Sequence, residues 1–449
     1  MNQTASAKRV CFVTLGCAKN EVDPDRMRSL VDASRSFECV ESPEDADVVV
    51  VNTCAFLTSA VAEGVETTLD LVNERVEGGV ACPVVMCGCI PSRYGSEVVE
   101  EMPEVAAFVP VDEEDGIVGV LGRVLGLGAC DAGVRPPVGR TVESACAYIK
   151  ISDGCDRYCS FCAIPYIRGR YYSRPESEIL DEARFLVEGG VRELVLIGQD
   201  TGVWGSDLPG RPTLAGLLRA VADVVSSVDG WVRVLYLQPE GLTQELVDTI
   251  REVPQIVPYI DIPLQHASAS VLKRMNRTGS RTEFMAMVRR LRDEVPGITL
   301  RTTAMVGFPG ESEEEFAELT EFLKEAEFDY CAVFSYSQEE GTAAAELPDQ
   351  VSPEVKLARE QQVIDLCEAN GFASASRRIG TVCRVLVDGV EDDGEGGFEA
   401  VGRTAFQAPD SDGVVHLGDI DVAMGDFIDV LIEDSACYEL FGSPIEKVD

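Results

Sequence analysis

Short apolar runs alternate with helical patterns along most of the chain. Within the first 125 residues, four runs rich in β-branched residues are each followed by a stretch with helical periodicity. These runs are VCFVTLG, DVVVVNTC, PVVMCGC and AAFVPV. Strands that alternate with helices are typical of α/β domains with parallel sheets. The pattern therefore predicts an N-terminal doubly wound parallel α/β domain over residues 8–125.

A second series of strands follows a stretch rich in Gly and Pro, residues 126–144, which is typical of a linker. The six strand candidates are AYIKIS, ELVLIG, WVRVLYL, YIDIPLQ, ITLRTTAMVG and YCAVFSY, and helical stretches separate them. Six βα units in a row predict an open sheet or a partial barrel, with functional groups at the carboxyl ends of the strands. Residues 351–370 predict a long returning helix, and we bound this central domain at 141–375.

The last part of the chain, residues 376–449, has a different pattern. Four short alternating runs, TVCRVLVDGV, FEAVGRT, GVVHLG and DFIDVLIED, are separated by Gly and Asp turns. Alternation of period two between such turns is typical of antiparallel strands. We therefore expect a small antiparallel β-barrel at the C-terminal end.

Composition adds a strong negative charge to this picture. The 449 residues are 45% hydrophobic and 26% charged, as in ordinary globular proteins, but 38 Lys and Arg face 78 Asp and Glu, so the net charge is −40. Such a surface repels phosphate backbones and attracts basic partners. The first residues do not resemble a secretion signal, and no run approaches the roughly 18 apolar residues of a membrane span. We expect a cytoplasmic protein with no membrane association, in which the sixteen cysteines stay reduced and favour metal or redox chemistry.

The most specific motif lies directly after the strand AYIKIS. Cys155, Cys159 and Cys162 have the spacing C-x3-C-x2-C on one short loop. Three thiolates can hold three irons of a cubane cluster and leave the fourth iron open for a ligand. The alternative is a structural zinc site, which requires four closed ligands. No second cysteine pair or His lies nearby, and the chain has only two His.

A second trio follows from the predicted topology. Cys17, Cys54 and Cys89 each come just after a separate strand candidate of the N-terminal domain. Because the ends of parallel strands share one edge of a sheet, we expect the three to converge in space and to hold a second cluster with one open iron. A buried apolar cysteine is the alternative at any one position. Cys87 competes with Cys89, but it lies inside the strand rather than beyond it.

The stretch YIKISDGCDRYCSFCAIPYIRGRYYSRP resembles the radical S-adenosylmethionine superfamily. The resemblance implies a partial barrel and a 4Fe–4S cluster whose open iron chelates the amino and carboxylate groups of S-adenosylmethionine. Reductive cleavage of that cofactor gives a 5'-deoxyadenosyl radical that removes an unactivated hydrogen. Because the cofactors carry the chemistry, we assign no catalytic side chain.

The order of LGCAKNEVD and NTC, the central cysteine loop and the terminal barrel resembles the methylthiotransferase family over nearly the whole chain. This implies that the N-terminal 4Fe–4S cluster supplies or holds the sulfur inserted into a C–H bond. One S-adenosylmethionine would donate the methyl group and a second would give the radical. The terminal barrel would be a TRAM domain, and the reductant a protein such as flavodoxin or ferredoxin.

The substrate is indicated by local sequences and by charge. IGQDTGVWG, YIDIPLQHASASVLKRMNR and YSQEEGTAAAELPDQV resemble the branch that modifies the β-carbon of an aspartate in small-subunit ribosomal protein uS12, free or in the subunit. The alternative branch modifies a tRNA adenosine. Residues 376–449 carry 17 Asp and Glu against 5 Lys and Arg, a net charge of −12. This sign suits a basic ribosomal protein, so direct RNA binding is not expected. An acidic face that merely solubilises the chain is the other explanation, because the remaining residues are acidic as well.

Further candidates have weaker support. Gln199 and Asp200 follow the second strand of the central domain and are expected to contact the ribose or amine of S-adenosylmethionine, with a turn cap as the alternative. Arg168, Arg170 and Arg174 could pair with the cofactor carboxylate or with the charge of a reduced cluster. Surface solvation is the alternative for at least two of these arginines.

Two histidines and one glycine-rich turn complete the candidates. His266 lies at a strand end and could line the cavity, although a structural role is commoner, and His416 is expected to be structural. Residues 307–311, GFPGE, resemble the adenine-side segment of the superfamily, but a lone Gly-rich turn is weak evidence. A nonenzymatic iron–sulfur or zinc protein for electron transfer or scaffolding is the remaining alternative, and it predicts four protein ligands and no cofactor cleavage.

Overall fold

The computed structural model describes residues 7–77, 82–128, 142, 144–392 and 398–445. Its chain forms two compact units. The first contains residues 1–141, 153–158 and 162–171, and the second contains residues 142–152, 159–161 and 172–449. Most of the predicted linker, residues 129–141 and 143, lies outside the described residues.

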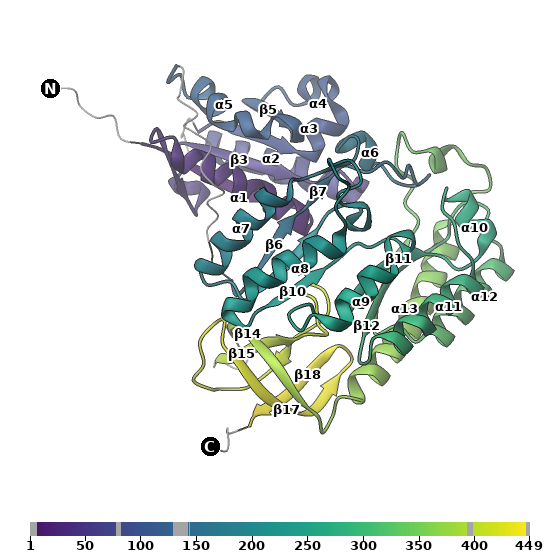
Figure 1. Cartoon of the computed structure of the whole chain (residues 1–449). Helices are drawn as coiled ribbons and strands as arrows, with labels where there is room; N and C mark the ends of the chain where they lie inside the picture. Colours follow the sequence, from purple (N-terminus) through teal and green to yellow (C-terminus); the bar gives the residue numbers. More distant parts are fainter. Residues whose placement is uncertain (1–6, 78–81, 129–141, 143, 393–397, 446–449) are drawn as a thin grey trace. The chain divides into compact units, whose positions relative to one another are not determined.

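The N-terminal part of the first unit, drawn in purple and blue in Figure 1, contains a five-stranded parallel sheet. The strand order is β2-β1-β3-β4-β5. Its strands are β1 (Lys8–Thr14), β2 (Phe37–Val40), β3 (Val48–Thr53), β4 (Val84–Gly88) and β5 (Ala107–Pro110). Its helices are α1 (Ala18–Ala33), α2 (Thr58–Glu77), α3 (Cys89–Tyr94), α4 (Ser96–Glu101) and α5 (Ile117–Val124). The doubly wound prediction is confirmed. Sequence reasoning missed β2, which is four residues long.

Both faces of this sheet are buried. On one face, Val48 and Val50 of β3 pack with Met27 of α1 and Leu121 of α5. On the other face, Val49 and its neighbours pack against α2, while α3 and α4 join a further apolar cluster with α2. A strand buried on both sides needs a continuous apolar run, which is why β3 reads VVVV.

The central domain contains six parallel strands, as predicted, in two three-stranded sheets of order β10-β9-β6 and β11-β12-β13. The six strands are β6 (Cys146–Lys150), β9 (Glu193–Ile197), β10 (Trp231–Val234), β11 (Tyr259–Gln265), β12 (Thr299–Val306) and β13 (Tyr330–Ser335). Two further strands of two residues each, β7 (Ser152–Asp153) and β8 (Tyr172–Ser173), come before and after the cysteine loop in the chain. A parallel bridge between Val232 and Ile256 lies between the two sheets. The six strands form the partial barrel that the sequence predicts.

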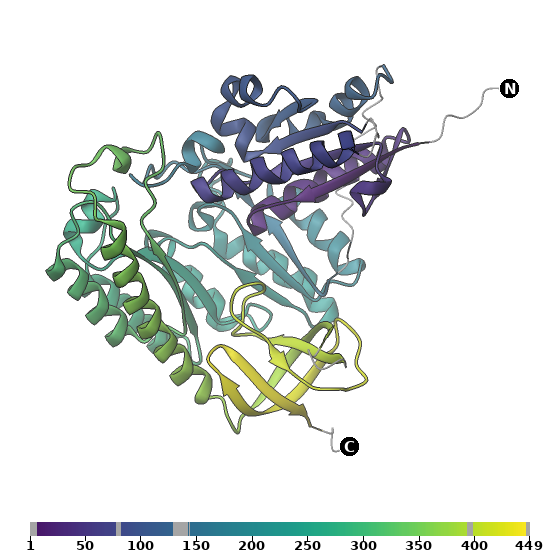
Figure 2. The same cartoon turned by 180° about the vertical axis from the view of Figure 1, so that it is seen from behind.

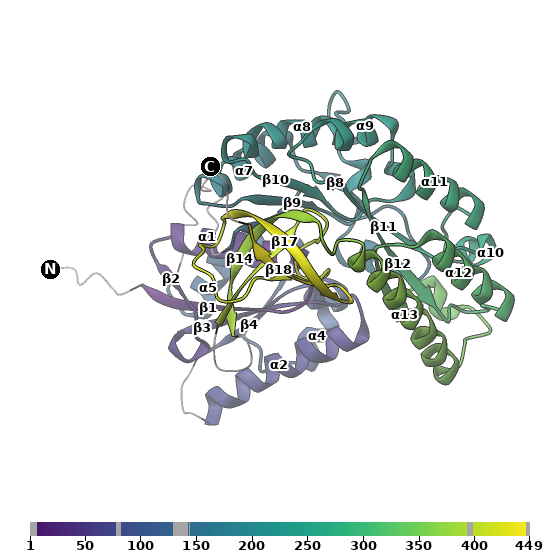
Figure 3. The same cartoon turned by 90° about the horizontal axis from the view of Figure 1, so that it is seen from below.

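Helices line the outside of these strands (Figure 3). They are α7 (Glu176–Glu188), α8 (Leu214–Val225), α9 (Gln244–Glu252), α10 (Ala269–Arg274), α11 (Arg281–Glu294), α12 (Glu313–Ala326) and the long α13 (Pro353–Ser376). α12 begins with a capping box, in which Ser312 accepts from the backbone N–H of Glu315 while the Glu315 side chain accepts from the backbone N–H of Ser312. None of the helices in the described part of the chain is both long enough and apolar enough to cross a membrane.

The chain ends in a closed five-stranded barrel at the end of α13, drawn in yellow in Figure 2. Its strands, in the order β14-β15-β16-β18-β17, are β14 (Val382–Asp392), β15 (Phe398–Thr404), β16 (Val415–His416), β17 (Phe427–Ala436) and β18 (Glu439–Pro444). The predicted barrel is confirmed, but sequence reasoning missed β18. This strand is short and follows β17 after only two residues, so the two appear as one segment in the sequence.

Buried ion pairs join the barrel to the central strands within the second unit. Glu193 of β9 accepts hydrogen bonds from Arg233 of β10 at 2.7 Å and from Arg403 of β15 at 2.6 Å. Arg403 also forms a two-pronged pair with Asp388 of β14 at 2.7 and 2.8 Å. Because unpaired buried charges are costly, these pairs specify how the barrel sits on the central domain.

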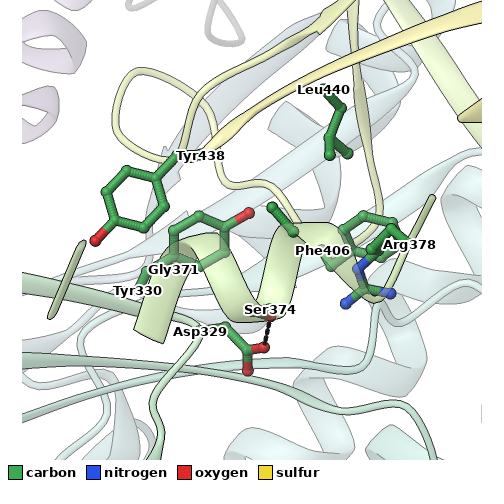
Figure 4. A pocket seen from close by; sticks show the side chains of 9 residues that line it. Asp329, Tyr330, Gly371, Ser374, Arg378, Phe406, Tyr438 and Leu440 are labelled. Atoms are coloured by element: carbon green, nitrogen blue, oxygen red, sulfur yellow. Dashed lines mark hydrogen bonds between the residues drawn. The ribbon is translucent and has the colours of Figure 1, made fainter. Parts of the chain in front are cut away.

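A small cavity lies between α13 and the barrel (Figure 4). Ser374 of α13 donates a hydrogen bond to Asp329, and the guanidinium of Arg378 lies 3.3 Å from the ring centre of Phe406. The volume is about 10 Å³, room for roughly one water molecule. This space is part of a packed junction and is too small for a substrate.

Candidate functional site

Three cysteines come directly after neighbouring strands of the N-terminal sheet. Cys17 follows β1 as the N-cap of α1, Cys54 follows β3, and Cys89 follows β4 as the first residue of α3. β1, β3 and β4 are adjacent and parallel, so their ends share one edge. Cys17 is exposed, Cys54 is half-buried and Cys89 is buried. Cys87 lies inside β4 and is completely buried, as the sequence predicts.

The thiol of Cys54 lies within electrostatic reach of the other two thiols. Burial raises the pKa of the Cys54 thiol, and the neighbouring Cys17 adds to that rise. Burial also raises the pKa of Cys89 to about 11; Arg168 opposes this rise, while Cys54 adds to it. A charge on any one thiolate is therefore felt by its neighbour. The predicted convergence of the three strand ends is confirmed, whereas metal ligation by them stays a prediction.

Two glycines make the tight turns that bring these cysteines together. Gly16 has φ +108° and Gly88 has φ +91°, in a region that favours glycine. A Cβ atom on Gly16 would lie 2.7 Å from Cβ of Cys54. A Cβ atom on Gly88 would lie 2.3 Å from the side-chain oxygen of Asn52 and 2.8 Å from the carbonyl of Thr53. The turns before Cys17 and Cys89 thus have no room for a side chain.

Arg168 lies beside this trio in the same compact unit. The segment 162–171 packs with the N-terminal sheet, and its short helix α6 (Ile164–Ile167) contributes to an apolar cluster with Cys89. The Arg168 side chain is only 3% exposed, and it forms ion pairs with Asp23 at 2.9 Å and Asp153 at 3.1 Å. Its Nη2 also lies 3.6 Å from Sγ of Cys89. This arginine can therefore act on the N-terminal cysteines.

The other two arginines of this segment have different surroundings. Arg170 is 85% exposed and pairs with Asp156 at 3.2 Å. Arg174 is largely buried and donates to Glu182 and to the carbonyl of Lys150, both at 2.7 Å. Surface solvation, the alternative for at least two of the three, holds for Arg170 alone. The spacing in RGRYYSR does not show which arginine is buried, because Asp23, one partner of the buried Arg168, is 145 residues away in the chain.

The C-x3-C-x2-C loop has contacts in both units. Cys155, Cys159 and Cys162 are all half-buried. In the first unit, the backbone N–H of Cys155 donates to the carbonyl of Gly169 at 3.2 Å. In the second unit, Nη1 of Arg277 lies 3.8 Å from Sγ of Cys159. The start of the loop and its middle cysteine thus each have a defined polar contact.

Thiols in this structure are reduced, and their arrangement is not that of a single-ion site. Every cysteine in the described ranges is a thiol rather than half of a disulfide. Among the described residues, no three His, Cys, Asp or Glu side chains are placed to hold one metal ion. In a cubane cluster each thiolate binds a different iron. Its ligands therefore need not surround one point.

The remaining candidates have mixed outcomes. Gln199 and Asp200 lie directly after β9, at the carboxyl end of the strand, and Asp200 is buried. The side chain of Asp200 does not cap the short turn that follows it, so the predicted cap is absent there. Contact of these two residues with S-adenosylmethionine stays a prediction.

Both histidines have structural surroundings. Nδ1 of His266 accepts a hydrogen bond from the backbone N–H of Ser268, and burial lowers its pKa to about 3, so the ring is neutral. His416 pairs with Glu399 at 2.8 Å and stacks on Phe441. The carboxylate of Glu311, the last residue of GFPGE, accepts from Arg359 at 2.9 Å and from the backbone N–H of Phe308.

Sequence reasoning missed Asn20 and Asp23 as members of the site. Both lie on α1 just after Cys17, and both are buried although polar. The signal was available in LGCAKNEVD, where Asn and Asp stand three residues apart on one helix face directly after the cysteine. A buried polar pair next to a candidate ligand indicates a specific partner, which in this structure is Arg168.

Comparisons with known proteins agree with the three parts of this fold. Residues 149–323 match the model of the radical SAM superfamily, residues 9–110 match uncharacterized protein family UPF0004, and residues 379–445 match the TRAM domain. A solved radical S-adenosylmethionine methyltransferase, TsrM from Kitasatospora setae, aligns with a TM-score of 0.56 at 14% identity over 73% of this chain and 72% of its own. The fold and the cysteine loop together define a radical S-adenosylmethionine protein.

Relatives that align over their full length identify a narrower family within this class. The ribosomal protein uS12 methylthiotransferase RimO of Geobacter sulfurreducens is 39% identical, and the alignment covers 98% of this chain and 99% of that protein. RimO of Pelotomaculum thermopropionicum is also 39% identical, over 97% of this chain and 99% of its own. The chain belongs to the RimO family of radical S-adenosylmethionine methylthiotransferases.

Proposed function

We propose that this protein replaces a hydrogen on the β-carbon of an aspartate in ribosomal protein uS12 with a methylthio group. The observation that carries the proposal is the presence of two cysteine trios in a chain that aligns end to end with RimO proteins. One trio lies in the C-x3-C-x2-C loop and the other at one edge of the N-terminal sheet. We place the reaction in the cytoplasm, where its substrate is made.

The donor chemistry of both trios fits iron–sulfur clusters. Soft thiolates are the ligands that iron–sulfur clusters take, and three thiolates leave one iron open. Cys155, Cys159 and Cys162 would hold the radical cluster. The second cluster would be held by Cys17, Cys54 and Cys89. When bound, these clusters and S-adenosylmethionine supply a radical that removes a hydrogen from an unactivated carbon and a sulfur that takes its place.

Residues around the loop orient its ligands. Nη2 of Arg277 donates to the side-chain oxygen of Gln238 at 2.6 Å and to the carbonyl of Pro263 at 2.7 Å, which fixes the guanidinium beside Cys159. A guanidinium held in this place can donate a hydrogen bond to the sulfur of a cluster ligand. Gln199 and Asp200, at the end of the neighbouring strand β9, are our candidates to hold polar groups of S-adenosylmethionine.

Charge supports a protein substrate rather than tRNA. The chain has a net charge of −40, and residues 376–449, which include the barrel, contribute −12. A domain that grips RNA needs Lys and Arg to displace the counterions of phosphates, whereas basic loops of a ribosomal protein are attracted to an acidic face. We therefore propose direct recognition of uS12 and no direct RNA binding, with flavodoxin or ferredoxin as the reductant.

The test is anaerobic reconstitution of the full chain with iron and sulfide, followed by reduction with dithionite in the presence of S-adenosylmethionine and a uS12 peptide. We expect 5'-deoxyadenosine and a peptide mass increased by the exchange of one hydrogen for CH₃S. Absence of 5'-deoxyadenosine would contradict radical chemistry. Its formation with a mass gain on tRNA instead of the peptide would move the assignment to the tRNA branch.

A matched pair of variants tests the second cluster. Cys89→Ser should lose about half of the bound iron, because one of two clusters loses a ligand. Cys87→Ser is the control, since this thiol is two residues away, inside β4, and is predicted to bind no iron. Equal iron content in both variants would contradict the proposed ligand set.

A further inference from the structure

Asn20 links the strand ends that precede two of the N-terminal cysteines. Its Nδ2 donates to the carbonyl of Leu15 at 3.0 Å and to the carbonyl of Thr53 at 2.9 Å. Leu15 lies just before the turn to Cys17, and Thr53 immediately precedes Cys54. One buried amide therefore fixes the backbone on the approach to both cysteines.

Arg168 connects Asn20 to Cys89, the third cysteine. Its Nη2 donates to Oδ1 of Asn20 at 2.8 Å and lies 3.6 Å from Sγ of Cys89. The Cys89 thiol in turn lies 3.7 Å from the same Asn20 oxygen. The amide of Asn20 and the guanidinium of Arg168 thus contact the surroundings of all three cysteines.

The charge balance of this group is unusual for a purely structural ion pair. Arg168 is almost completely buried between two carboxylates, Asp23 and Asp153, and it still directs one N–H toward a sulfur. Two carboxylates would suffice to compensate one guanidinium, so the sulfur contact is not needed for charge balance. A hydrogen bond to a ligand sulfur is one of the ways in which a protein sets the potential of a cluster.

We propose that Asn20 and Arg168 are positioning residues that hold Cys17, Cys54 and Cys89 in a cluster-binding arrangement, with Arg168 donating to the sulfur of Cys89. The inference rests on the proposed function, because it assumes that these cysteines bind the second cluster. Asn20 sets the backbone and Arg168 supplies the cation beside the ligand. A reduced cluster carries one more negative charge than an oxidised one, so this cation favours the reduced form.

The experiment uses the full chain with Cys155, Cys159 and Cys162 replaced by Ala, so that any cluster it binds is the N-terminal one. In this background Arg168→Gln is combined with Asp23→Asn, which leaves the net charge of the buried group unchanged. Asp153 then keeps the hydrogen bond from the backbone N–H of Gly154. Arg168→Lys keeps the charge but loses the planar fork. The control is Arg170→Gln, since Arg170 is exposed and lies outside the cysteine group.

The readouts are the rate of anaerobic iron release to a chelator and the midpoint potential from a dye-mediated titration followed by electron paramagnetic resonance. We expect release to be about 10- to 100-fold faster in the Arg168→Gln/Asp23→Asn variant, the usual effect of losing a group that orients a metal ligand. Its midpoint potential should be more negative, because the sulfur of Cys89 loses the hydrogen bond from Arg168 while the net charge nearby stays the same. Arg168→Lys should restore part of the difference. The control should match the background chain.

Two failures can be told apart. If the background chain binds no iron, the proposal of a second cluster is wrong. If it binds iron, but the Arg168→Gln/Asp23→Asn variant keeps the control's release rate and potential, then Arg168 only pairs with its carboxylates and the inference is overturned. Circular dichroism of each metal-free variant identifies a chain that has not folded, and in that case Arg168→Lys alone decides the comparison of potentials.

Discussion

The buried carboxylate of Glu193 offers the sharpest test of the energetics, because two arginines depend on it. Glu193 and Arg233 are 0% exposed, and Arg403 is 4% exposed. Glu193→Gln keeps the volume of the side chain and removes only its charge. Arg403 retains its ion pair with Asp388. Arg233 keeps a hydrogen bond to a carbonyl oxygen at 3.0 Å, the ring of Tyr259 at 4.6 Å and the longer-range attraction of Asp412, but no hydrogen-bonded carboxylate among the described residues.

The expected loss is about 3–5 kcal/mol of the free energy of unfolding, since breaking one member of a buried pair leaves an uncompensated charge. This is a large part of the total of about 5–15 kcal/mol that folded domains have. The midpoint of urea unfolding should fall by roughly 1 M or more. Because both tryptophans, Trp204 and Trp231, are buried in the second unit, their fluorescence reports the unfolding of the unit that contains Glu193.

The control is Glu321→Gln at an exposed pair, where Glu321 accepts from Arg281 at 2.7 Å. Exposed pairs contribute only about 0.2–1 kcal/mol, so this variant should unfold almost like the parent chain. If Glu193→Gln costs no more than Glu321→Gln, the reasoning from burial is refuted. The double variant Glu193→Gln/Arg233→Met should cost less than the sum of its single changes, because the two side chains interact directly.

The same pair has a defined pH dependence. Burial alone would raise the pKa of Glu193, but Arg233 and Arg403 outweigh it and hold the pKa below its usual value. The folded chain therefore binds this proton less readily than the unfolded chain does. The stability that Glu193 contributes is complete at neutral pH and is lost as the pH falls below about 4.5 through the pKa of the folded state. The difference in stability between parent and Glu193→Gln should accordingly shrink in acid.

Two further changes have defined outcomes. Gly88→Ala forces a Cβ atom against backbone at positive φ, so it should lower the free energy of unfolding by about 2 kcal/mol or more and abolish iron binding at the proposed N-terminal site. Gly95→Ala, also at positive φ but in open space, should still bind that iron. Equal iron loss in both variants would contradict the crowding argument. Hydrogen bonds from Arg274 and other donors outweigh the effect of burial and lower the pKa of Glu315 to about 2. Glu315→Gln should therefore lower the free energy of unfolding by about 1–3 kcal/mol at pH 7, and by less as the pH falls from 4.5 toward 2. The measurement is urea unfolding of the metal-free chain. A penalty for Glu315→Gln that stays constant with pH would contradict this.

The elements that the sequence predicts well are those whose pattern is local. β3 reads VVVVNT and is buried throughout, and its flanking residues identify where the strand ends. Placing Cys54 after this strand, and Cys17 and Cys89 after its two neighbours, required only the rule that parallel strands end at one edge. β2 was missed because it is only four residues long, and β18 because it follows β17 after only two residues, so that the two strands appear as one segment.

Long-range charge pairing is the part that a single sequence cannot supply. Arg168 and Arg170 stand two residues apart in the segment IRGRYY, yet one is buried and the other is 85% exposed. Asp23, the partner that retains Arg168 inside, is 145 residues away in the chain. Nothing local distinguishes these two arginines, because burial of a cation depends on whether tertiary structure brings carboxylates to it.

At the cysteine loop, the compact units of the structure do not follow the domain boundaries that the sequence predicts. The sequence separates an N-terminal domain at 8–125 from a central domain at 141–375, but residues 153–158 and 162–171 pack as one unit with the N-terminal sheet. Asp153, just before the loop, and Cys89, at the sheet edge, both contact the guanidinium of Arg168. A change at this arginine therefore acts on the surroundings of Cys89 and on Asp153, the residue two positions before Cys155.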